Sequence, residues 1–149
     1  MKLFKKKQRQ PDLGTGVWKR AADRFDRSLD RYHQVLDGIE DTEDYNHAVV
    51  IGNELVQLAG HVRELAARAQ EASPSYTLDV PGKLSDAHRA LSRASNSLAT
   101  AVEALALYRL ASEQGLRLDA TTHLDAVRFR LDIVKRDVAE SELILDAAS

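Results

Sequence analysis

The sequence predicts an all-α fold, an antiparallel bundle of four long helices whose chain runs up, down, up and down. Two observations support this prediction. Apolar residues recur in alternating steps of three and four through four long segments, and only helices that pack nearly parallel hide such rows from water. The 149 residues include 7 Gly and 3 Pro, with 44% hydrophobic and 30% charged residues, which is typical of a helical globular domain.

A short polar connection separates the first two helical segments. The first is expected to end at Gly38, since glycine accepts the left-handed conformation that follows many helices. The second is expected to begin after Asp41 and Thr42, which can cap its first turn, and to close at Ser73, because the residue before Pro74 avoids the helical region. The apolar row of the first segment is Trp18, Ala22, Phe25, Leu29, Tyr32, Leu36 and Ile39. The row of the second segment is Ala48, Ile51, Leu55, Leu58, Val62, Leu65, Ala69 and Ala72.

The third and fourth segments follow the longest connection, residues 73–83. The third is expected to end near Gly115, and the fourth is expected to begin near Asp119 or Thr121. Each segment is about 26 to 30 residues long, which gives helices of roughly 40 Å at 1.5 Å per residue. The third row is Leu84, Ala87, Leu91, Ala94, Leu98, Ala101, Leu105 and Tyr108. The fourth row is Leu124, Val127, Leu131, Val134, Val138, Ser141 and Leu145, with Ser141 its one polar member.

Connection lengths bear on the topology. The short connections make the first and second helices, and likewise the third and fourth, antiparallel neighbours. The connection over residues 73–83 is about ten residues long and, at about 3.3 Å per residue when extended, could just cross the length of the bundle. The simple up-down-up-down order is therefore the prediction, and a crossover is the alternative.

A basic arm precedes an acidic body. Residues 1–14 are predicted to be a flexible basic arm, and residues 15–149 a single four-helix domain. Residues 1–10 hold five basic residues and no acid, which leaves 16 basic residues against 23 acidic ones in the rest of the chain. The arm could adhere weakly to an anionic membrane, or it could be a solubilising terminus without a partner; the acidic body makes nucleic acid a poorer match. The basic residues of the arm are Lys2, Lys5, Lys6, Lys7 and Arg9.

Several absences in the sequence narrow the class of protein. No apolar stretch follows the basic N-terminus as in a signal peptide, and no window reaches the roughly 18 apolar residues of a membrane-spanning helix, so a cytoplasmic protein is expected. The sequence has no Cys, which excludes disulfides, thiolate nucleophiles and cysteine-bound metals. In composition the body, rich in Ala, Arg and Asp, resembles proteins of GC-rich bacteria, and this likeness identifies no activity.

Histidine and carboxylate residues offer one speculative metal site. The pattern Asp-x-x-His occurs at Asp30 and His33 and again at Asp44 and His47, on either side of the first connection. On adjacent helices these four residues would lie at similar heights, where they could bind zinc or another divalent cation. Three of them fall beside the apolar rows and are expected to face solvent. The prediction is therefore no metal and no cofactor, with a metal- or small-ligand-binding bundle as the alternative function.

The sequence favours a non-enzymatic interaction module over an enzyme. It lacks the P-loop, dinucleotide-binding, Gly-x-Ser-x-Gly and His-Glu-x-x-His motifs. Several apolar residues of the second and fourth segments lie outside the rows. Some of these widen the core, and the rest are expected to form an interface for self-association or for a protein partner. The residues concerned are Phe129, Ile133, Leu143, Ile144, Val49 and Val56.

Overall fold

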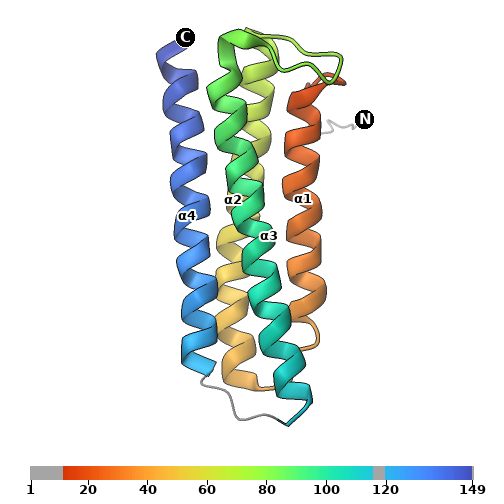
Figure 1. The fold of residues 1–149 in the computed structure, drawn as a ribbon, viewed down its shortest axis with the longest axis vertical. Coiled ribbons are helices and arrows are strands. Elements are labelled where there is room, and N and C mark those ends of the chain that lie inside the picture. Colours follow the sequence, from red (N-terminus) through yellow and green to blue (C-terminus); the bar gives the residue numbers. More distant parts are fainter. Residues whose placement is uncertain (1–11, 116–119, 149) are drawn as a thin grey trace, which may run out of the picture.

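Four long α-helices make up the protein, and the residues that the structure describes contain no strand. The structure is a computed structural model that describes residues 12–115 and 120–148, with side chains from residue 123 onward in the last helix. The helices lie side by side along the long axis of the molecule (Figure 1). The predicted all-α class is confirmed. The elements are α1 (Val17–Leu36), α2 (Thr42–Ala72), the short 3-10 helix η1 (Gly82–Leu84), α3 (Ser85–Glu113) and α4 (Ala120–Ala148).

Each long helix packs along two others. α1 lies against α2 and α3, and α4 lies against the same two helices. Trp18, at the start of α1, donates its indole N–H to the carbonyl of Ser73, just after α2, at 2.9 Å. Ser141, near the end of α4, donates its hydroxyl to the carbonyl of Ala87, near the start of α3, at 3.1 Å. In both pairs the beginning of one helix therefore lies beside the end of the other.

Local polar contacts set the ends of α1 and α2. α1 has 20 residues, fewer than the roughly 26 to 30 that the sequence suggested. It stops at Leu36 because the chain tightens into a turn, in which the amide of Gly38 donates to the carbonyl of Val35 at 3.1 Å. α2 begins where the sequence predicted, with the side chain of Asp41 accepting the amide of Asp44 at 2.9 Å.

The ends of α3 and α4 also agree with the sequence. α3 stops at Glu113, and Gly115 follows with a φ of 75°, in the left-handed region that favours glycine. α4 begins at Ala120, between the two predicted starts. Both helices have 29 residues, which is the length that the apolar rows imply.

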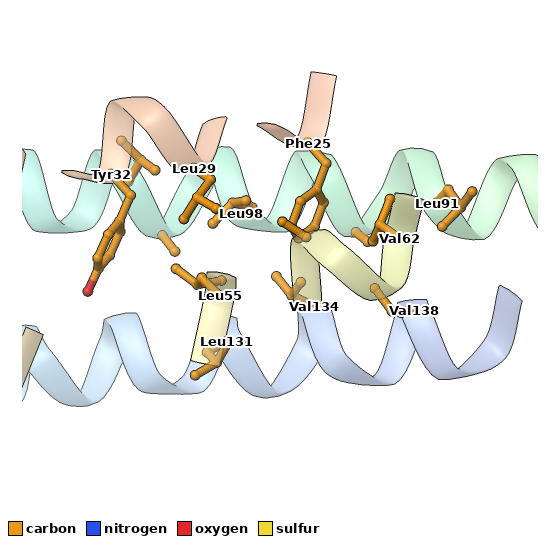
Figure 2. Close-up of a cluster of buried hydrophobic side chains, with 14 of the residues drawn as sticks. Phe25, Leu29, Tyr32, Leu55, Val62, Leu91, Leu98, Leu131, Val134 and Val138 are labelled. Carbon is orange, nitrogen blue, oxygen red and sulfur yellow. The ribbon is translucent and has the colours of Figure 1, made fainter. Parts of the chain in front are cut away.

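The apolar rows form the core. Every member of the first, third and fourth rows is buried, and Figure 2 shows Phe25, Leu98 and Leu131 from three helices directed into the shared interior. In the second row, Leu58 is only half-buried, and Ala72 is exposed at the last position of α2. The three- and four-residue spacing therefore identified the buried side of each helix.

The segment before α1 and the link between α2 and α3 fold against each other. Leu13 is 6% exposed and packs with the core, although it precedes residue 15, where the sequence analysis placed the start of the domain. The buried Ser75 of the link accepts the amide of Val17, the first residue of α1, at 3.1 Å. The amide of Ser75 donates in turn to the side chain of Gln70 at 3.0 Å. The link is therefore fixed against the beginning of α1.

Candidate interaction surfaces

The residues of the speculative metal site do not converge. Asp30 and His47 are exposed, and His33 is half-buried. The carboxylate of Asp44 accepts a hydrogen bond from the hydroxyl of Tyr108. Within residues 12–115 and 120–148, no group of three His, Asp or Glu side chains is placed to hold a metal ion. The geometry therefore gives the metal-binding alternative no support.

The pKa of the Asp44 carboxyl is raised above its ordinary value. Burial raises the pKa of this carboxyl, and the neighbouring carboxylates of Asp41 and Glu43 raise the pKa further. Asp44 acts here as an acceptor that joins the first turn of α2 to α3.

The residues expected at a partner interface divide into exposed and half-buried sets. On α4, Phe129 and Leu143 keep 61% and 69% of their surface in solvent, and Val56 on α2 is also exposed. The half-buried members are Val49, Ile133 and Ile144. The first and last of these pack against the core, because the buried side of a bundle helix is wider than a single apolar row. The exposed set is therefore centred on α4.

A second set of exposed apolar residues was missed by the sequence analysis. Leu107 on α3 is 64% exposed, and Leu110 is exposed three residues later. The sequence could have predicted their exposure. Leu107 follows the buried Leu105 by two positions, and Leu110 follows the buried Tyr108 by two, which places both leucines on the opposite side of the helix. Further exposed apolar residues are Tyr45, Val50, Tyr76, Leu78 and Val80.

The residues predicted to contact anionic surfaces all belong to the arm. The described chain begins at Asp12, whose carboxylate accepts the amide of Gly14 at 2.9 Å. The role of the arm therefore stays a prediction. Its residues Lys2, Lys5, Lys6, Lys7 and Arg9 lie outside the part of the chain that the structure describes.

Charged side chains join the helices across the surface. Glu54 of α2 accepts hydrogen bonds from Arg128 at 2.7 Å and Lys135 at 2.5 Å, both on α4. These two cations hold the pKa of Glu54 below its ordinary value. Arg63 of α2 binds Asp26 of α1 in the same way. Because such partly exposed pairs contribute only about 0 to 1 kcal/mol each, they align neighbouring helices more than they stabilise the fold.

Two histidines have shifted pKa values of opposite sign. His61 on α2 lies between Glu142 of α4, at 2.9 Å, and Glu64, at 3.5 Å. Burial lowers the pKa of His61, but its two carboxylate partners outweigh burial and leave the pKa raised. His88 on α3 lies edge-on to the ring of Trp18, with 5.6 Å between ring centres, and burial lowers its pKa. Of these two histidines, His61 is held toward its charged form.

Two hollows open on the surface of the described residues. One hollow, about 230 Å³ in volume, lies between α1 and α3, with Ser92 and His88 both on its wall. No hydrogen bond joins Ser92 to His88, so the hydroxyl lacks the contact with a base that would make it a nucleophile. Another hollow, of about 440 Å³, opens beside the end of α2. It is lined by Asp12, Ala67, Arg68, Gln70, Glu71, Pro74 and Tyr76.

Comparisons with known proteins reveal no relative. No protein-family model, no curated protein and no solved structure matches the chain. Among the helices as described, none combines the length and the apolar character needed to cross a bilayer.

Proposed function

We propose that this protein is a non-enzymatic helical interaction module that associates with a second copy of itself or with a protein partner, and that its basic arm contacts anionic surfaces. The observation that carries the proposal is the exposure of Phe129 and Leu143 on α4. Covering apolar surface stabilises an assembly by about 25 cal/mol per Å², so large exposed apolar side chains favour an interface.

The two exposed residues of α4 share one side of that helix. Phe129 and Leu143 are fourteen residues apart, close to four turns of 3.6 residues. Asp132, Arg136 and Glu140 lie between them and are exposed. This side of α4, the α4 face, is therefore apolar at both ends and carries charges of both signs in the middle.

The apolar ends of the α4 face match each other under two-fold symmetry. Arg136 lies seven residues from Phe129 and seven from Leu143. Two copies of α4 related by a two-fold axis at Arg136 would run antiparallel and bring Phe129 of each copy against Leu143 of the other. In the same arrangement Arg136 faces Arg136 of the other copy and Asp132 faces Glu140, so the charged middle adds no attraction and the apolar ends carry the contact. This symmetry supports self-association.

We also infer an antiparallel bundle in up-down-up-down order. The start of α1 contacts the end of α2, and the start of α3 contacts the end of α4, so the helices of each pair run in opposite directions. Between α1 and α3, by contrast, Trp18 contacts His88, and Arg24 further along α1 binds Asn96 further along α3. These two helices therefore run in the same direction. In this order α4 packs on α2 and α3 and keeps its outer side free for a partner.

Size-exclusion chromatography with light scattering tests self-association. The full chain is expected to show about twice the mass of one 16.6 kDa copy at micromolar concentration. Phe129→Ser combined with Leu143→Ser is expected to give the single-copy mass, because both apolar ends of the α4 face are lost. The matched control combines Leu107→Ser with Leu110→Ser, which changes two exposed leucines of α3 and is expected to keep the doubled mass.

A single-copy mass for the native chain would contradict self-association and leave binding of a protein partner as the proposed function. Affinity capture with the native chain and with the α4 double variant as baits then decides. A protein held by the native bait and lost with the variant supports the module, whereas identical captures with both baits contradict a role for the α4 face.

A further inference from the structure

Charges on α1 are sorted by side. Asp23 and Asp26 face α2, where both approach the guanidinium of Arg63. The arginines of α1 instead recur in steps of four, three and four residues, which places them in one stripe along the helix. The stripe is about 16 Å long at 1.5 Å per residue. This arginine stripe consists of Arg20, Arg24, Arg27 and Arg31.

No carboxylate neutralises the arginine stripe within the described chain. Its members are all exposed, and Arg24 binds the neutral side-chain amide of Asn96 on α3. The other three guanidiniums make no hydrogen bond or ion pair with any residue that the structure describes. Asp30 and Glu103 are exposed beside the stripe, but the four arginines outnumber them. Elsewhere in the bundle, carboxylates bind Arg63, Arg68, Arg89, Arg93, Arg109 and Arg128.

At one end of the stripe, the link between α2 and α3 holds apolar side chains in water. Leu78 and Val80 lie in a hollow together with Arg20, and Leu78 is 69% exposed. The link is well anchored, because Ser75 both caps α1 and donates its hydroxyl to the carbonyl of Thr77 at 3.2 Å. An anchored segment that presents aliphatic side chains outward is suited to contact an apolar phase.

At the other end of the stripe, α3 presents two leucines. Leu107 and Leu110 follow Asn96 by eleven and fourteen residues, about three and four helical turns. They therefore lie on the side of α3 from which Asn96 reaches Arg24. The arginine stripe together with Leu78, Val80, Leu107 and Leu110 forms what we call the α1–α3 surface. It carries arginines in the middle and exposed aliphatic residues at both ends.

We propose that the α1–α3 surface binds a membrane that contains anionic phospholipid. A guanidinium matches a lipid phosphate with paired N–H donors. Aliphatic side chains beside it can enter the boundary between headgroups and acyl chains. Nucleic acid would also supply phosphates, but its exposed bases stack on aromatic rings, and this surface offers aliphatic side chains instead. A bilayer therefore fits both components of the surface.

Membrane binding by this surface is independent of the α4 face. The arginine stripe and its apolar ends belong to α1, α3 and the link, whereas self-association is assigned to α4. Losing Phe129 and Leu143 is expected to change the mass of the particle, and losing the arginines is expected to change lipid binding. Failure of one proposal is therefore distinguishable from failure of the other.

Flotation of the full chain with lipid vesicles tests the proposal. The vesicles are phosphatidylcholine alone, or phosphatidylcholine with phosphatidylserine at about three to one, at low and high salt. Native protein is expected to float with the anionic vesicles and not with the neutral ones. Arg27→Gln combined with Arg31→Gln is expected to weaken partitioning about thirtyfold, which corresponds to about 1 kcal/mol per arginine near an anionic membrane. Both residues are exposed and make no hydrogen bond or ion pair within the described chain, so the fold is expected to be unchanged.

Two further variants separate charge from apolar contact. Arg68→Gln with Arg128→Gln removes the same charge from the side of the bundle formed by α2 and α4. This variant is expected to weaken partitioning by less than about threefold, because charges farther from the membrane than a Debye length of about 10 Å are screened by salt. Leu78→Ser with Val80→Ser is expected to weaken partitioning about tenfold through lost apolar insertion. The variant Arg27→Gln with Arg31→Gln, the stripe variant, is also measured in a chain that carries Lys5→Gln, Lys6→Gln and Lys7→Gln. Membrane binding by the basic arm then cannot hide a loss of binding by the arginine stripe.

Each outcome decides the proposal. The proposal is supported if the stripe variant loses binding to anionic vesicles and the Arg68/Arg128 variant does not, whether or not the lysines of the arm are substituted. Equal losses in the stripe and Arg68/Arg128 variants, equal binding to neutral vesicles, or no vesicle binding at all would overturn it. Binding to an RNA or DNA oligomer but not to vesicles would overturn it in favour of nucleic acid.

Discussion

Single polar side chains cap the beginnings of α1 and α2. The cap of α2 is local, since Asp41 accepts the amide of Asp44 three residues later. The cap of α1 is remote, because Ser75 accepts the amide of Val17 across 58 residues of sequence. The same serine bonds Gln70 and the following link, so one hydroxyl and one amide organise the end of the molecule where the link lies.

The variant Ser75→Ala is expected to lower the free energy of unfolding by about 1 to 2 kcal/mol, because it removes a helix cap and leaves the amide of Val17 without a partner. Urea denaturation of the purified full chain measures this change. The control is Ser112→Ala, at an exposed site on α3, with an expected change within about 0.5 kcal/mol. Equal effects of the two substitutions would show that Ser75 does not cap α1.

Two histidines at contacts between helices respond to pH: His61 beside Glu142 and His88 beside the ring of Trp18. A raised pKa of His61 in the folded state means that His61 stabilises the fold when protonated. This contribution is complete below the ordinary histidine pKa of 6.5 and disappears as pH rises through the folded value. The lowered pKa of His88 has the opposite consequence, since its contribution is present above 6.5 and is lost as pH falls through the folded value.

The stability difference between the native chain and His61→Gln is therefore expected to be larger near pH 5.5 than near pH 8.5, on either side of the ordinary value of about 6.5. For His88→Gln the difference is expected to be larger at the higher pH. Chemical denaturation at the two pH values measures both differences, and each variant serves as the control for the other. A same-signed pH dependence in both would contradict the contacts described for these histidines.

On the scale of the whole molecule, one apolar core holds the four helices together. Leu98 of α3 is fully buried among residues of the other helices (Figure 2). Leu107 on the same helix stays in solvent. Chemically identical side chains therefore have different roles that depend only on the side of α3 from which they project.

Leu98→Ala is expected to lower the free energy of unfolding by about 2 to 5 kcal/mol through loss of apolar burial and formation of a cavity. Leu107→Ala, the matched control on the same helix, is expected to change it by less than about 0.5 kcal/mol. Thermal and urea denaturation of the two variants provide the comparison. A large effect at Leu107 in dilute solution would instead indicate that this leucine is covered by a partner.

The sequence alone determined the helices and their buried sides. Spacings of three and four residues are a local property of an α-helix, so Trp18, Leu98 and Leu131 could be assigned to the core before any contact was known. Caps within one turn, such as Asp41, and the left-handed Gly115 were readable for the same reason. The free α4 residues Phe129 and Leu143 were partly readable, because they fall outside the apolar row.

Tertiary structure decided everything that depends on residues far apart in the chain. Only packing shows that Leu13 belongs to the core, that Ser75 caps α1, and that Ile144 is partly covered while Leu143 is not. The uncompensated charge of the arginine stripe could not be read from sequence either. It depends on where α2 places Arg63 and on α3 offering a neutral Asn96 to Arg24, and helical periodicity specifies neither of these neighbours.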